Sequence, residues 1–156
     1  MKSILASVLL FTTLSLAYAQ PALPNPAQVS ESGLTAQQAE QVLRFVLVRG
    51  KYGKIITLRG AYIEGSFFDK DGKQSIPGFY TFRLAHDSPK VGATDYFGPF
   101  VVSQKTATVW DVGLGSGCKK FESAALARLE VAIIKKTKSP PPDENILHDN
   151  FDCLNE

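Results

Sequence analysis

The hydrophobic positions between residues 34 and 50 repeat with the period of a helix. The apolar face consists of Ala39, Val42, Leu43 and Val46, at positions i, i+3, i+4 and i+7. Thr35 and Gln38 have the spacing of a capping box, in which each side chain caps the backbone of the other residue. Gly50 is a natural stop because glycine often follows the end of a helix. We therefore predict a helix that begins just after Thr35 and ends near Gly50.

A strand-like composition begins at Lys54. The run from Lys54 to Phe68 is rich in β-branched and aromatic residues, which favours an extended strand. Gly60 and Gly65 inside this run indicate bulges or bends. The pair Asp71-Gly72 is a turn signal, so we predict a hairpin at this point.

Two later stretches also have the pattern of strands. Residues 79–87 alternate in polarity and place Tyr80, Phe82 and Leu84 on one face. Residues 96–112 are interpreted as two strands joined around Gln104, Lys105 and Thr106.

A second helix is predicted between Glu122 and Lys138. Its apolar stripe consists of Ala125, Leu126, Leu129 and Ile133. Three lysines lie in its last turn, where they complement the helix dipole, and the run Ser139 to Asp143 with its three prolines ends it. Strands grouped between two helices predict an α+β fold, with an antiparallel sheet of three to four strands packed on one or both helices.

The first nineteen residues have the layout of a secretory signal peptide. Lys2 supplies a positive start, Ile4 to Leu16 is apolar, and Ala17-Tyr18-Ala19 fits a cleavage site. The apolar run is too short for a helix that spans a bilayer. We therefore expect cleavage after Ala19 and a mature protein in a bacterial periplasm or outside the cell.

The mature chain divides into three parts. Residues 20–33 hold three prolines and no apolar period, which predicts a semi-extended leader outside the core. Residues 34–138 form the single α+β domain, and residues 139–156 form a tail.

The charge balance gives no reason to expect a nucleic-acid or membrane partner. Without Lys2 the chain holds 16 lysines and arginines against 15 acidic residues. Binding to phosphate backbones or anionic lipid needs a clear excess of positive charge. The oligomeric state is left open.

Cys118 and Cys153 are the two cysteines of the chain, and export would place both in an oxidising compartment. We predict a disulfide between them, which would turn the tail back along the second helix. Two free thiols, or one reactive thiol, are the alternative.

The glycine-rich corner between residues 113 and 117 does not fit a phosphate-binding motif. A dinucleotide fingerprint requires a third glycine where Cys118 stands, and a P-loop requires Gly-Lys-Ser/Thr. Ser116 lacks the flanking pattern of a nucleophile elbow. We expect a flexible corner, with no cofactor.

No coherent catalytic or metal-binding set emerges elsewhere. Cys118, His86 and Asp87 would supply a thiol, a base and an orienting carboxylate, but a disulfide and a solvated histidine explain them more simply. The carboxylates Asp87, Asp95 and Asp111 are scattered over strand ends, and no pair is selected. No catalytic residue and no metal ligand is therefore predicted.

The aromatic residues of the strands exceed what one buried face can hold. Neighbours such as Phe67 and Phe68 must point to opposite faces of a strand, so some rings lie on a second face. This second face is a candidate protein-contact surface, formed around the loop 86–96 and the hairpin 69–73. The alternative is that the tail and loops cover these rings. The candidate partner-binding residues are Phe68, Arg83, His86 and Tyr96.

Residues 34–112 resemble a PepSY-type or cystatin-like unit, in which a helix precedes a curled antiparallel sheet. The stretch Lys105 to Val109 occupies the family's closing hairpin, with Ala107 where the family often has glycine. In size, export signal and architecture the chain also looks like small exported immunity proteins that protect bacteria from cell-wall-degrading toxins.

These observations favour a non-catalytic protein-binding module, an inhibitor or immunity protein whose partner is a hydrolase or toxin. A small-molecule binder with a pocket lined by Tyr80, Phe82 and Trp110 is the first alternative. A small hydrolase that uses Cys118 or the scattered carboxylates is the second.

Overall fold

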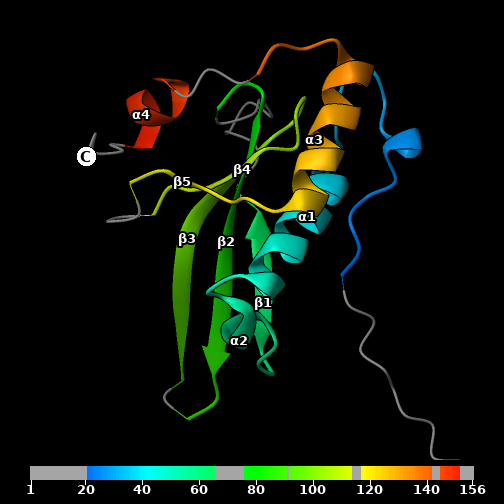
Figure 1. The fold of residues 1–156 in the computed structure, drawn as a ribbon. Coiled ribbons are helices and arrows are strands. Elements are labelled where there is room, and N and C mark those ends of the chain that lie inside the picture. Colours follow the sequence, from blue (N-terminus) through cyan, green and yellow to red (C-terminus); the bar gives the residue numbers. More distant parts are fainter. Residues whose placement is uncertain (1–20, 66–75, 91, 114–116, 142–144, 152–156) are drawn as a thin grey trace, which may run out of the picture.

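The sheet of this protein has five antiparallel strands in the order β1-β2-β3-β4-β5 (Figure 1). The structure is a computed structural model that describes residues 21–65, 76–90, 92–113, 117–141 and 145–151. The α+β class is confirmed, but five strands replace the three or four that we predicted. The elements are η1 (Pro26–Gln28), α1 (Ala36–Arg49), α2 (Gly53–Ile56), β1 (Ala61–Gly65), β2 (Phe79–Ser88), β3 (Ala93–Ser103), β4 (Val109–Asp111), β5 (Lys119–Lys120), α3 (Ala124–Thr137) and α4 (Asn145–Phe151).

Helix α1 begins where its capping box predicts. The Thr35 hydroxyl accepts a hydrogen bond from the Gln38 amide at 3.2 Å, and the Thr35 amide donates to the Gln38 side chain at 2.9 Å. Gly50 caps the C-terminal end, also as predicted.

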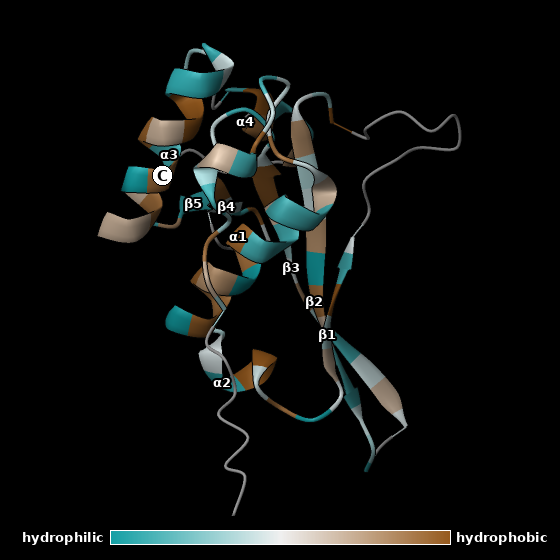
Figure 2. Ribbon diagram, turned by 90° about the vertical axis from the view of Figure 1, so that its right-hand side faces the viewer, coloured by the Kyte–Doolittle hydropathy of each residue, from teal (hydrophilic) through white to brown (hydrophobic). Residues whose placement is uncertain are grey.

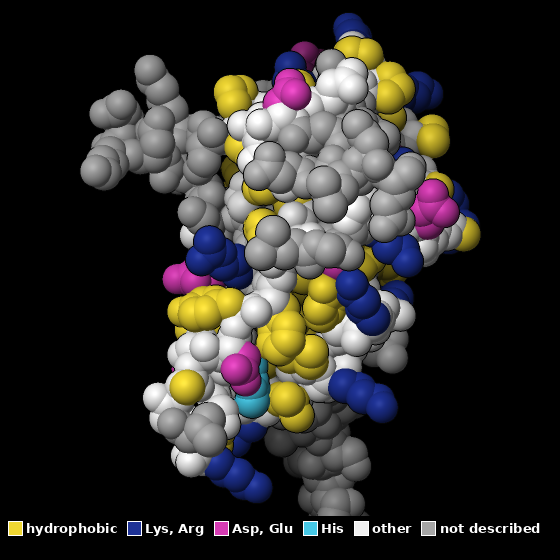
Figure 3. Space-filling view, turned by 90° about the vertical axis from the view of Figure 1, so that its left-hand side faces the viewer, with side chains coloured by type: hydrophobic (Ala, Val, Ile, Leu, Met, Phe, Trp, Pro, Cys, Tyr) yellow, Lys and Arg dark blue, Asp and Glu magenta, His cyan; other side chains and the backbone are white. Residues whose placement is uncertain are grey.

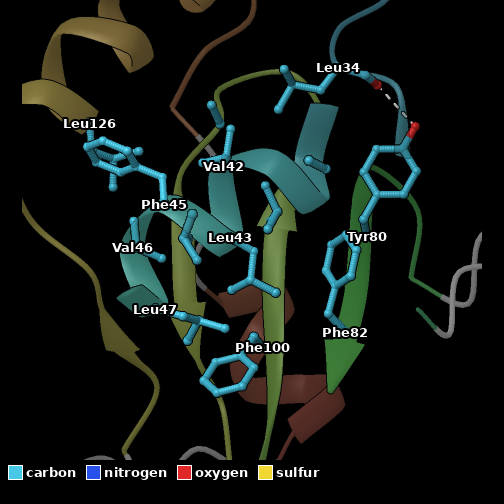
Figure 4. Close-up of a cluster of buried hydrophobic side chains, with 14 of the residues drawn as sticks. Leu34, Val42, Leu43, Phe45, Val46, Leu47, Tyr80, Phe82, Phe100 and Leu126 are labelled. Carbon is cyan, nitrogen blue, oxygen red and sulfur yellow. Dashed lines mark hydrogen bonds between the residues drawn. The ribbon is translucent and has the colours of Figure 1, made fainter. Parts of the chain in front are cut away.

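One face of the sheet, here called the inner face, packs on α1 and α3, which lie on the same side of it (Figure 2). Tyr80, Phe82 and Leu84 point from β2 into this core, as their alternation predicts. The Tyr80 hydroxyl donates to the Leu34 carbonyl at 3.0 Å, so this buried phenol keeps a partner (Figure 4). The side chains drawn around them come mainly from α1 and include Val42, Leu43, Phe45, Val46 and Leu47.

The opposite, outer face is covered at one end by α4. Phe79, Val101 and Trp110 project from this face, and Leu147 of α4 packs on them with 1% of its surface exposed. The tail is therefore part of the fold, because its residues 145–151 form a helix that buries the second layer of aromatic rings. This burial explains why the strands carry more large apolar side chains than one core needs.

The prediction of one strand from Lys54 to Phe68 was wrong at its start. Residues 53–56 form the short helix α2, and in the described part of this run Ala61–Gly65 are extended. Ile56 of α2 is buried in the inner core. Burial against α1 therefore overrides the strand preference of the β-branched pair Ile55-Ile56. Phe67, Phe68 and the predicted hairpin 69–73 lie outside the described residues.

The leader does not stay outside the core, which corrects a second prediction. Val29 of the leader is 1% exposed and belongs to the inner core. The Lys136 ammonium donates to the Ala27 carbonyl at 2.8 Å, and directly after the leader the Leu34 amide donates to the Gln104 carbonyl at 2.8 Å. The proline-rich leader thus lies along the domain and packs against it.

The glycine-rich corner is followed by a fifth strand that we did not predict. Lys119 and Lys120 pair with Asp111 and Trp110 before the chain enters α3. The Ser123 side chain then accepts a hydrogen bond from the Leu126 amide and caps α3. Within the described residues, no helix is both long and apolar enough to cross a membrane.

Candidate partner-binding face

The end of the outer face that α4 does not cover carries two exposed tyrosines. We call this surface the tyrosine face and define it by Tyr62, Glu64, Arg83, Ala85 and Tyr96. The register pairs Ala85 with both Tyr62 and Tyr96, so the three side chains form one row across β1, β2 and β3. Tyr62 is 39% exposed and Tyr96 is 54% exposed, whereas Ala85 is completely covered.

A small side chain separates the two rings. Ala85 ends at its methyl group and is completely covered, although its partners in the register are two exposed tyrosines. Partial loss of hydration is the largest cause that raises the pKa of Tyr62, and the carboxylates of Asp87 and Glu64 add to it.

Opposite charges flank the tyrosine row. Glu64 of β1 and Arg83 of β2 are exposed cross-strand partners in the next row of the sheet. Rigid tyrosines beside an arginine are the side chains that most often dominate the binding energy of protein interfaces. The surface offers hydrogen-bond donors and acceptors on an apolar base, which suits recognition of a protein.

The structure separates the four predicted partner-binding residues. Arg83 and Tyr96 lie on the tyrosine face, where Tyr96 pairs with Ala85, two residues after Arg83 on β2. His86 does not join them, because alternation places it on the inner face, where its Nδ1 lies 4.0 Å from Asp95 Oδ2. Phe68 lies outside the described residues. The sequence reasoning missed Tyr62, whose role depends on the register of β1 against β2.

The predicted loop 86–96 is mostly strand. β2 continues to Ser88 and β3 starts at Ala93, so four residues connect the two strands. The Thr94 hydroxyl donates to Asp87 at 2.8 Å across the two strands. Strand pairing therefore holds this end of the sheet in place up to the turn.

A buried carboxylate lies on the inner side of β4. The Asp111 side chain is 3% exposed, accepts a hydrogen bond from the Tyr52 hydroxyl at 2.8 Å and pairs with the Lys51 ammonium at 3.0 Å. The Gly113 amide donates to its other oxygen at 3.2 Å. Beside it lies a hollow of about 340 Å³, whose lining includes Lys119 and Lys120. Each oxygen of Asp111 has a partner, so we interpret it as a structural tie.

The two alternative functions lose their geometric basis. Tyr80 and Phe82 belong to the inner core, whereas Trp110 belongs to the outer cluster, so these three buried residues line no common pocket. Cys118 also packs at the outer cluster beside β5, and His86 lies on the inner face near the other end of the sheet. His86 pairs with Asp95 on β3, whereas β4 and β5 begin beside Phe100. Asp95 precedes Phe100 by five residues, or about 16 Å of strand, so His86 and Cys118 lie apart on the sheet.

The scattered carboxylates likewise form no pair. Asp87 points to the outer face, Asp95 to the inner face, and Asp111 is engaged by Lys51 and Tyr52. Cys118 is not a free thiol in the structure. Its predicted partner Cys153 lies outside the described residues, so the pairing of these two cysteines stays a prediction.

Comparison with known proteins identifies the class as the immunity proteins of type VI secretion. The family model described as "T6SS, Immunity protein Tgi2PP" matches residues 33–145, and the chain belongs to this family. The resemblance to immunity proteins is thereby confirmed, whereas the PepSY-type or cystatin-like resemblance receives no support.

A solved structure is similar over most of the chain. It is described as the structure of a type VI secretion system effector-immunity complex from Pseudomonas protegens. The similarity has 35% sequence identity and a TM-score of 0.71, and covers 86% of this chain and 100% of that chain. A comparison with curated proteins gave no match.

Proposed function

We propose that this protein is an exported immunity protein that neutralises a toxic protein effector by binding it, without catalysis. The family match over residues 33–145 carries this proposal. The structural neighbour at 35% identity, found in an effector-immunity complex, supports a protein as the partner. The separation of Cys118, His86 and the carboxylates in the fold supports a role without catalysis.

The tyrosine face is the proposed contact surface. It combines two exposed tyrosines with Arg83 on a continuous sheet, and the inner face of that sheet is already occupied by α1 and α3. Aromatic and arginine anchors on a rigid strand framework lose little conformational entropy when they bind. Arg83 and Tyr96 therefore remain proposed binding residues, and Tyr62 joins them.

The proposed compartment is the periplasm, and the proposed target is a hydrolase that degrades the cell wall. Cleavage after Ala19 is a prediction from sequence, because residues 1–20 lie outside the described part. The described chain supports it, since the Pro21 carbonyl already accepts a hydrogen bond from Arg49 at 3.3 Å. The folded domain would therefore begin almost directly after the cleavage site.

Protection against an effector tests this function. Each type VI effector of the producing organism is directed to the periplasm of a bacterial host, with or without co-expression of this protein. We expect rescue of growth from one effector, and a stable complex of the two purified proteins. Inhibition of peptidoglycan hydrolysis by that effector then tests the hydrolase target.

Variants of the tyrosine face localise the contact. The double variant Tyr62→Ala/Tyr96→Ala is expected to weaken binding at least about 100-fold, because two aromatic anchors are lost. Val131→Ala on α3, which changes a 68% exposed side chain away from the sheet, is the matched control and should bind normally. Rescue from no effector would refute the function, and equal binding by the double variant would refute the surface.

A further inference from the structure

Among the described residues, the first half of β3 has one backbone edge without a neighbouring strand. β4 pairs only with Phe100, Val101 and Val102, and the Val112 amide donates to the Pro99 carbonyl at 2.9 Å. The first half of β3, Ala93 to Phe97, therefore pairs with β2 alone among the described residues. This edge lies directly beside the tyrosine face, because Tyr96 belongs to both.

The hydrogen-bonding pattern shows which backbone groups point outward. The Asp87 amide donates to the Gly60 carbonyl at 3.1 Å, so the backbone of Asp87 points away from β3. Asp87 and Thr94 are therefore a pair without mutual backbone bonds, and the N–H and C=O of Thr94 point to the open edge. Ala85 lies two residues before Asp87, so its backbone also points away from β3. The N–H and C=O of its partner Tyr96 therefore point to the open edge as well.

Side chains flank this edge on both faces of the sheet. Tyr96 is exposed on the outer face, and Phe97 is partly exposed on the inner face, where its ring lies 6.3 Å from that of Tyr52. In the lower half of Figure 3, hydrophobic side chains form a patch with Lys and Arg side chains along its border. The edge thus offers apolar contacts on both sides of any strand that is added to it.

Positive charge lies on β5, one strand beyond β4 and past the end of the open edge. Lys119 pairs in register with Asp111, which is itself the partner of Phe100, and Lys51 binds Asp111 from the inner side. Within the described residues Lys119 has no acidic partner. An acidic side chain on an incoming segment would therefore find a cation at this end.

We propose that an extended segment of the effector adds to the sheet as a strand along Ala93 to Phe97. Backbone hydrogen bonds to Thr94 and Tyr96 supply affinity, and the side chains of Tyr96 and Phe97 select apolar residues on alternate positions. An acidic residue of the segment lies toward Lys119. The inference rests on the proposed function and names the part of the effector that this surface recognises.

A proline at the open edge tests the proposal. Thr94→Pro removes one outward N–H and leaves the bonds to β2 intact, and edge strands tolerate proline. Thr94→Ala is the matched control, because it also loses the side-chain bond to Asp87 but keeps the N–H. We expect Thr94→Pro to weaken binding of the effector identified by rescue at least about tenfold relative to Thr94→Ala.

The outcomes separate this inference from the proposed function. If the wild-type protein binds no effector, both fall. If it binds, and folded Thr94→Pro binds as tightly as Thr94→Ala, only the added strand is refuted. Circular dichroism and thermal unfolding establish that both variants are folded.

Amide hydrogen exchange of the wild-type protein gives a second measurement that needs no variant. The amides of Thr94 and Tyr96 should exchange fast in the free protein and become protected in the complex. Unchanged exchange at both amides would overturn the proposal even if Thr94→Pro failed to fold. Protection that grows with concentration of the free protein, together with dimer formation in sedimentation, would instead assign the edge to a second copy of the chain.

Discussion

Asp111 joins two parts of the chain that are distant in sequence. Its carboxylate binds Lys51 and Tyr52, which follow the end of α1, and thereby holds them against β4. The Tyr52 ring lies edge-on to Phe100 at 5.0 Å, so the phenol is also fixed by packing. Removing one partner of a buried carboxylate lowers the folding stability more than removing one partner of an exposed ion pair, because the buried charge is left less compensated.

We predict that this tie makes the folding stability decline at alkaline pH. The hydrogen bond to Asp111 is the largest cause that raises the pKa of Lys51, and burial is the largest that raises the pKa of Tyr52. The folded state therefore holds both protons more tightly than the unfolded state. Their stabilisation is complete below about pH 10, the ordinary range of these groups, and is lost as pH rises through the raised values.

The free energy of unfolding in urea, measured between about pH 8 and about pH 11, checks this prediction. Tyr52→Phe keeps the ring but removes the hydroxyl, and should cost about 1.5 kcal/mol near neutral pH. Its stability should then fall less steeply with pH than that of the wild type. Identical slopes for the two proteins would show that Tyr52 takes no part in the alkaline transition.

Among the elements, those with local signals were predictable from the sequence. α1 begins at Ala36 because Thr35 and Gln38 cap each other, and this needs no contact beyond four residues. The inward face of β2 follows from simple alternation. By contrast, β5 is two residues long and exists only because β4 lies beside it.

The helices α2 and α4 depend on distant partners and were missed for that reason. α4 has seven residues, and its buried contact is Leu147 against Trp110 and its neighbours. Helices of this length have little stability alone, so tertiary packing decides whether they form. Leu147 and Phe151 do have the i, i+4 spacing of a helix, but a run this short does not by itself show that it packs on the sheet.

The leader is the element whose interpretation changes most, and we predict that it contributes to stability. Val29→Ala should lower the free energy of unfolding by about 2 kcal/mol, because a fully buried side chain loses two methyl groups. Val131→Ala makes the same change at an exposed helix position and should have almost no effect. Chemical unfolding of both variants gives the comparison. Equal effects would mean that residue 29 lies outside the core after all.

At the scale of the whole molecule, the surface we assign to binding is what the two coverings of the sheet leave exposed. The leader and helices occupy the inner side, and α4 occupies one end of the outer side. Alternation along β2 separates Arg83 from His86, because His86 shares the face of Tyr80, Phe82 and Leu84. Adding Tyr62 required the register of β1 against β2, which depends on pairings up to 25 residues apart, as between Ala61 and His86.

The two ends of the mature chain carry the last prediction, which concerns export and the disulfide. Leu147 and Phe151 of α4 pack in the same cluster as Cys118, and α4 ends two residues before Cys153, which supports a bond between the cysteines. Intact mass of the protein exported from its native gene should correspond to Gln20 to Glu156 with two hydrogens missing and no alkylation.

Reduction should then lower the free energy of unfolding by about 4 kcal/mol, because the bond closes a loop of about 35 residues. The free energy of unfolding of the double variant Cys118→Ser/Cys153→Ser should not change with reductant, and should equal that of the reduced wild type. A mass that retains residues 1–19 would contradict export with cleavage. Two alkylated thiols in the exported protein would show instead that α4 is held on Trp110 by packing alone.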